Sequence, residues 1–183
     1  MIWSMSRTFF KEMGTLERFI DYPDVVEEYY YLMVRVLKTC PGPLLGSPQD
    51  TASLIVAGIQ GLQLDHRAAH LGIVTFFDEL LRVAATSSSN NAAIKSVGDG
   101  AAVIVQSIGA NLVAALMQCL AGQLPGYASG SRRGDVSIIG VLGRVRDLTP
   151  GDFQVRAAFY ALPLSLLLSL SLPPSLSLPP ACE

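Results

Sequence analysis

The sequence predicts an all-α fold: an α-solenoid of about three antiparallel helix pairs, followed by a low-complexity C-terminal tail. Over most of residues 1–161, apolar residues recur at steps of three and four, which is the period of an amphipathic helix. Strand-like alternation of apolar and polar residues does not occur before the tail. Half of the 183 residues are hydrophobic, so the chain has the material for an extended core.

The first expected helix covers residues 2–20, and the second begins at Pro23. A proline costs no hydrogen bond at the first helical position, and the acidic residues behind it suit the positive end of the helix dipole. The second helix is expected to end at CPGP, residues 40–43. The first helix spaces Phe9, Met13, Leu16 and Ile20 on one face. The second spaces Val26, Tyr29, Tyr30, Met33, Val34 and Leu37, while one of its three consecutive tyrosines must point elsewhere.

Three more helices are expected at 48–62, 66–84 and 98–122. Asp65 is predicted to cap the middle one, because a carboxylate accepts backbone N–H bonds of the first turn. The polar stretch 86–91 is expected to be a loop. The inward residues of the helices at 48–62 and 66–84 are Leu54, Ile55, Ile59, Ala69, Ile73, Phe76, Phe77 and Leu80. Those of the helix at 98–122 are Val103, Ile104, Ile108, Val113, Leu116 and Leu120.

The last expected helices cover 135–148 and 150–161, after a loop at 123–134. Thr149 and Pro150 suit the cap and the first position of the final helix. First helices begin near 3, 48 and 98, and second helices near 24, 66 and 135. The first two pairs begin about 45 residues apart, as HEAT and armadillo pairs do. Such pairs bury their apolar faces only against their neighbours, which is the basis for predicting a solenoid.

The composition changes at Leu162. Residues 162–183, LPLSLLLSLSLPPSLSLPPACE, consist almost entirely of Leu, Ser and Pro and carry no charge before Glu183. Paired prolines would break a helix, so we expect a disordered tail after a helical segment that covers residues 1–161. A frame-shifted or mis-spliced end is the alternative explanation.

The charge and the cysteines exclude several classes of function. Thirteen basic and fifteen acidic residues leave a formal charge of −2, so there is no basic field for direct nucleic-acid binding. Cys40, Cys119 and Cys182 are scattered, which indicates reduced thiols rather than a zinc knuckle or a disulfide framework. The apolar stretch Ala157–Leu172 is short and interrupted, so no membrane span is expected.

The two histidines, His66 and His70, would share one face of a helix and resemble half of a zinc-protease motif. That motif needs a glutamate directly after the first histidine, and Arg67 stands there instead. We therefore expect His66 to be solvated and His70 to flank the apolar stripe. A small metal-dependent hydrolase centred on these two histidines is kept only as a third alternative.

Other candidate chemistry is equally weak. Asp78 and Glu79 are adjacent, so they point in different directions, and with Arg82 they are expected to form a solvated face. The GDG sequence at 98–100 is expected to be a loop or helix start rather than a phosphate loop. The chain has no GxSxG sequence, and no cysteine lies beside a histidine in the sequence. We expect no enzyme, no catalytic residue, no metal and no cofactor.

Three stretches carry a resemblance to a known family. FIDYPDVVEEYYYLMVRVLKTCP (19–41), LDHRAAHLGIVTFFDELL (64–81) and SIGANLVAALMQCLAGQLP (107–125) occur in the order found in the importin-β superfamily. They resemble the C-terminal HEAT repeats of its transportin-SR and importin-thirteen branch, over roughly residues 3–160. His70, the stretch at 86–91 and the tail depart from that pattern.

The resemblance implies a nuclear transport receptor that moves between nucleus and cytoplasm and carries protein cargo through the nuclear pore. Cargo would include serine/arginine-rich splicing factors or other nuclear proteins, and nucleoporins would be further partners. Ran-GTP would act through repeats outside this chain, without direct nucleic-acid or membrane binding. No cargo-contact residue can be assigned. A generic helical-repeat interaction scaffold is the alternative.

Overall fold

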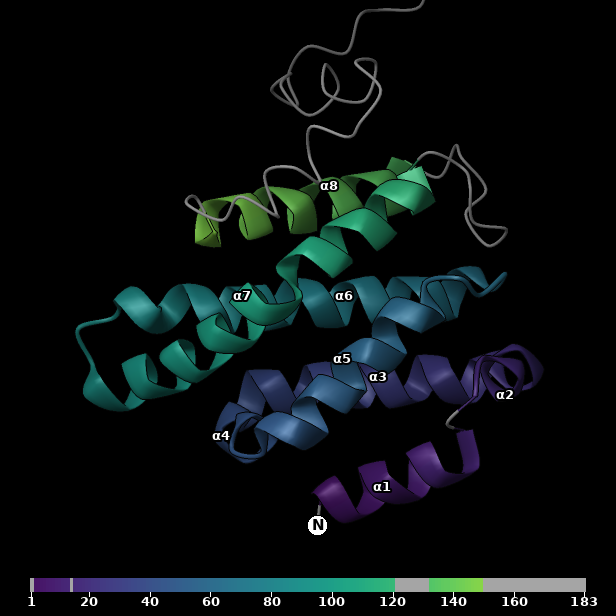
Figure 1. Cartoon of the computed structure of the whole chain (residues 1–183), viewed down its shortest axis with the longest axis horizontal. Helices are drawn as coiled ribbons and strands as arrows, with labels where there is room; N and C mark the ends of the chain where they lie inside the picture. The colour runs from purple at the N-terminus through teal and green to yellow at the C-terminus, as the bar shows by residue number, and fades with distance from the viewer. Residues whose placement is uncertain (1, 14, 121–131, 150–183) are drawn as a thin grey trace, which may run out of the picture.

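The computed structural model describes residues 2–13, 15–120 and 132–149, and this part of the chain is all-helical, as predicted. Figure 1 shows the order of its elements. The helices are α1 (Ile2–Met13), α2 (Leu16–Asp21), α3 (Pro23–Thr39), α4 (Pro41–Leu45), α5 (Pro48–Gly61), α6 (Arg67–Ala84), α7 (Ala92–Leu120) and α8 (Arg132–Leu148). A short 3₁₀ helix, η1 (Ala85–Ser88), joins α6 to α7.

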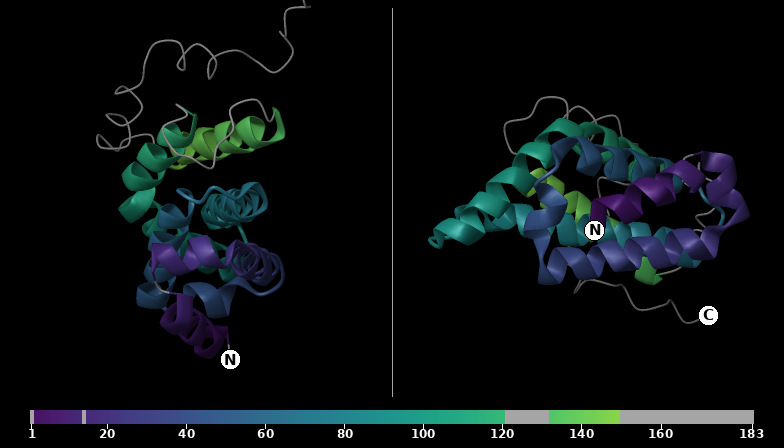
Figure 2. Two further views of the ribbon diagram at one scale, coloured as in Figure 1. Left: turned by 90° about the vertical axis from the view of Figure 1, so that its right-hand side faces the viewer. Right: turned by 90° about the horizontal axis from the view of Figure 1, so that it is seen from below.

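Helix α6 lies at the centre of the arrangement. It packs between α3 and α8, and these three helices lie side by side in Figure 1. The view from the side in Figure 2 places α5 and α7 in a second layer, where α7 packs against both α6 and α8. Each helix of the first layer therefore buries its apolar face against its neighbours and the second layer, and one core runs through the stack.

Aromatic rings connect the N-terminal helices to α6. The rings of Phe9 and Tyr29 stack with centroids 3.7 Å apart, and Tyr30 meets Phe76 edge-on at 5.5 Å. The hydroxyl of Tyr30 donates to the carbonyl of Leu54 at 3.0 Å, so this fully buried ring has no unsatisfied polar atom. All six residues predicted for the inner face of α3 are buried, and Tyr31 is the tyrosine that points elsewhere.

The first expected helix is instead two helices. Thr15 begins α2 as its N-cap, because its hydroxyl accepts the N–H of Arg18 at 3.4 Å. The break changes the direction of the chain, so the apolar face of α1 does not continue into α2. Met13 and Phe19 are buried, whereas Ile20, expected on the inner face, is 60% exposed.

The start of α6 also differs from the prediction. His66 rather than Asp65 is its N-cap, and the Nδ1 atom of His66 accepts the N–H of Ala69 at 3.2 Å. Asp65 is exposed. The expected apolar stripe of α6 is buried throughout. Glu79, expected on the solvated face, is also buried, because it lies under the guanidinium of Arg82.

Helix α7 begins earlier than expected, at Ala92, so the GDG sequence lies inside it rather than at its start. Gly98 is buried where α7 crosses η1: a Cβ atom there would lie 2.7 Å from the carbonyl carbon of Thr86 and closer still to Ser87. Only glycine allows this approach of the two backbones. The stretch 86–91, expected as a loop, overlaps η1. Val103, expected to point inward, is 65% exposed.

Helix α7 is long and apolar enough to cross a membrane by length and composition, the only such helix in the part of the chain described. Half of the 18-residue window that meets this criterion is buried within the fold, and one such helix is weak evidence for a membrane span. The stretch Ala157–Leu172, the helix at 150–161 and the tail at 162–183 lie outside the described residues. At the end of α8, the hydroxyl of Thr149 donates to the carbonyl of Val145 at 2.7 Å.

Candidate functional site

The two histidines do not share a site. His66 stands at the surface end of α6, where its Nε2 atom lies 3.6 Å from the Oδ1 atom of Asp24. His70 is buried one turn later, and its Nε2 atom lies 3.5 Å from the Sγ atom of Cys119. The two side chains therefore face different surroundings, which removes the geometric basis for a hydrolase centred on both.

His66 does lie in a cluster of groups that often bind metals. One ligand atom from each of Asp24, Glu27 and His66 lies within 4.8 Å of the others. The Nδ1 atom of His66 already accepts the N–H of Ala69, so the proton of the neutral ring is on Nε2. A metal ion on Nε2 would require the ring proton to move to Nδ1. Nδ1 could then no longer accept the N–H of Ala69, and α6 would lose its cap. The cluster is therefore better explained as a polar contact between the starts of α3 and α6.

The contact between His70 and Cys119 joins residues 49 positions apart, which no local pattern in the sequence indicates. Burial lowers the pKa of His70 to about 4 and raises the pKa of Cys119 to about 12. Both groups are therefore neutral at pH 7. A catalytic cysteine needs a thiolate and access to substrate, and Cys119 is buried. This pair acts in packing rather than in catalysis.

The paired carboxylates also separate. Asp78 accepts the Nε–H of Arg144 at 2.8 Å, which ties α6 to α8. Glu79 accepts from Arg82 on its own helix, with the Nε atom at 3.0 Å. As expected for adjacent residues of a helix, they point in different directions and share no reacting centre.

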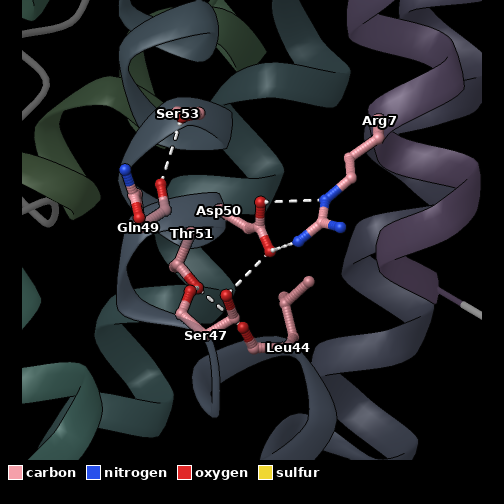
Figure 3. Close-up of polar contacts among 7 residues, drawn as sticks. All are labelled: Arg7, Leu44, Ser47, Gln49, Asp50, Thr51 and Ser53. Carbon is pink, nitrogen blue, oxygen red and sulfur yellow. Dashed lines mark hydrogen bonds and ion pairs between the residues drawn. The ribbon is translucent and has the colours of Figure 1, made fainter.

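A polar cluster ties α1 to the start of α5 (Figure 3). Two nitrogens of Arg7 donate to the carboxylate of Asp50, at 3.4 and 3.1 Å, and the hydroxyl of Ser47 donates to it at 2.7 Å. The hydrogen bonding from Arg7, and to a smaller extent that from Ser47, lowers the pKa of Asp50. The hydroxyl of Thr51 lies close to the carbonyls of both Leu44 and Ser47, at 2.6 and 2.9 Å. The cluster ties α1 to the start of α5, and Arg7 and Asp50 also line a small surface groove.

Three surface grooves are candidate binding sites. The smallest, of about 280 Å³, lies beside the polar cluster of Arg7 and Asp50 and also includes Lys11. The α2–α5 groove, of about 500 Å³, is lined mainly by uncharged residues, among them Phe10, Leu16, Phe19 and Val56. The α3–α6–α7 groove, of about 440 Å³, has apolar walls and two cationic side chains. These two larger grooves are open to solvent.

No protein-family model matches the chain, and a search of curated proteins finds no match. The described residues bring together one histidine–cysteine pair, one surface cluster of three potential ligands and three open grooves.

Proposed function

We propose that the chain is the C-terminal segment of a nuclear transport receptor of the importin-β type. In this proposal, residues 1–161 form HEAT-type helix pairs that bind protein cargo, and the complete receptor passes the nuclear pore through contacts with nucleoporins. Ran-GTP controls cargo release through repeats outside this chain. The receptor moves between nucleus and cytoplasm, and the chain itself has no enzymatic role.

The observation that supports this proposal most is the position of α6. It packs between α3 and α8, while α5 and α7 lie in a second layer (Figure 2). In a stack of helix pairs each pair contacts only its neighbours, so the stack can bend around a partner. The three stretches that resemble the family lie on α2–α3, on α6 with the turn before it, and on α7 with the residues after it.

A generic helical-repeat scaffold would use the same layers and grooves without Ran. The two roles differ in one measurable property, the release of bound proteins by Ran-GTP. The complete gene product, immobilised and loaded from a nuclear extract, should release its bound proteins when Ran carrying a non-hydrolysable GTP analogue is added. Ran-GDP is the control and should release little. Equal retention with both forms would contradict the transport role and favour the scaffold.

A further inference from the structure

The α3–α6–α7 groove lies where the C-terminal ends of α3 and α6 meet the start of α7. Its floor is apolar, since Leu37 and Val83 are almost fully buried. One wall is open: Ile94 is 47% exposed although it lines the groove. An exposed isoleucine above a buried apolar floor provides a place where a second apolar side chain would be removed from water.

Two cations line the same groove, Lys38 from α3 and Arg82 from α6. Lys38 forms no salt bridge among the described residues. Arg82 pairs with Glu79, but that carboxylate lies beneath it and is 7% exposed, while the Arg82 side chain is 55% exposed. No carboxylate lines the groove. The α2–α5 groove has no charged residue in its lining, and the groove beside Arg7 and Lys11 also contains the carboxylate of Asp50. Of these three grooves, only the α3–α6–α7 groove has cations without a carboxylate in its lining.

We propose that the α3–α6–α7 groove binds a peptide segment with acidic and apolar side chains from a partner protein. An apolar side chain of the partner packs between Ile94 and Leu37, and a carboxylate beside it meets Lys38 and the outer side of Arg82. Charge complementarity of this kind speeds association and selects the partner. The proposal does not depend on the transport role, because a helical scaffold would present the same groove.

Other occupants fit less well. A symmetric contact between two copies of the chain would bring the cations of both grooves together, because the same patch meets itself across a two-fold axis. An anionic membrane needs a broad basic surface, whereas the chain has a formal charge of −2 and the groove holds two cations. An acidic peptide satisfies both the charge and the apolar floor.

The test is a selection from a displayed library of random peptides of about twelve residues, with the full chain as bait, followed by anisotropy measurements on the most enriched peptide. Enriched sequences should combine acidic with apolar residues. Lys38→Glu should weaken binding about fivefold, in a salt-dependent way, and Ile94→Asp by roughly tenfold or more. Arg82 is left unchanged, because its removal would strand the buried Glu79.

Matched controls lie on α7, outside the groove lining. Lys95→Glu makes the same charge change as Lys38→Glu, and Val103→Asp replaces an apolar residue that is even more exposed than Ile94, at 65% against 47%. Both should leave the affinity unchanged, and circular dichroism checks that every variant is folded. Failure to enrich any peptide would overturn the proposal, as would enrichment without acidic residues or equal effects of groove and control variants. Self-association or binding to phosphatidylserine vesicles that is lost in Ile94→Asp would overturn it in favour of those occupants.

Discussion

The Nε2 atom of His70 lies 3.5 Å from the Sγ atom of Cys119, and this contact joins α6 to α7 inside the core. The thiol also lies 3.9 Å from the carbonyl of Leu62, at the end of α5. Three helices thus meet at one buried polar point. Its groups are neutral at pH 7, because burial opposes a charge on either side chain.

Protonation of His70 should destabilise the fold as the pH falls. Burial lowers the pKa of His70 from 6.5 to about 4, so below pH 6.5 the unfolded chain binds a proton that the folded chain does not. The resulting loss in the free energy of unfolding is absent above pH 6.5. Below that pH it grows by roughly 1.4 kcal/mol per pH unit, until the folded state also titrates. Urea unfolding should therefore show a loss of about 2 kcal/mol between pH 7 and pH 5.

The control for this loss is a side chain that cannot titrate. His70→Gln should remove most of the pH dependence in that window, whatever its effect on overall stability. His66→Gln leaves His70 in place and should therefore retain the contribution of that residue. An unchanged slope in His70→Gln would assign the loss to other groups.

Cys119 should resist thiol reagents in the folded protein. Burial raises its pKa to about 12 and also blocks access, whereas Cys40 is exposed. Brief alkylation followed by peptide mass spectrometry should label Cys40 well before Cys119. In denaturant the two rates should become similar. Rapid native labelling of Cys119 would show that α6 and α7 separate readily.

Gly98 and Gly100 lie on the same helix and give opposite predictions. Gly98→Ala would place a Cβ atom against the backbone of Thr86 and Ser87, so we expect a loss of about 2 kcal/mol or more. Nothing lies within 4 Å of a Cβ atom at Gly100, and alanine favours helices, so Gly100→Ala should stabilise by up to about 1 kcal/mol. Thermal unfolding of both variants measures the difference; equal melting temperatures would refute the packing of α7 on η1.

Phe76 should matter far more to stability than His66. The ring of Phe76 is fully buried and meets those of Tyr30 and Phe77, each at 5.5 Å, so Phe76→Ala should cost about 3–5 kcal/mol. His66→Ala removes a helix cap and an exposed contact with Asp24, at about 1 kcal/mol. Denaturant midpoints give this ordering directly. The reverse ordering would mean that the histidine, not the aromatic stripe, organises α6.

Much of the fold follows from periodicity along the chain. The six buried residues of α3 and the apolar stripe of α6 recur at helical spacing, and Pro23 and Pro48 mark where helices begin. Periodicity shows which residues share a face, but not which element covers it. Val103 lies on a helix that is apolar nearly all round, so its exposure depends on where α6 and α8 lie.

The candidate site was less predictable, because it is made of contacts between distant segments. Nothing near His70 in the sequence points to Cys119, and Lys38, Arg82 and Ile94 come from three different helices. The prediction of Asp65 as the cap of α6 is wrong by one residue, because aspartate is among the preferred N-cap residues and histidine is not. The prediction of Ile20 as a core residue failed because the chain turns at Thr15.

The most direct test of the proposed transport role is an import assay in permeabilised cells. A fluorescently labelled protein bound by the complete gene product should enter nuclei when that product, Ran and GTP are all supplied. Import should stop when the product is omitted or when Ran is held in its GDP form. Equal nuclear accumulation with and without the product, or import that ignores the nucleotide on Ran, would contradict the role and leave the chain as a helical scaffold.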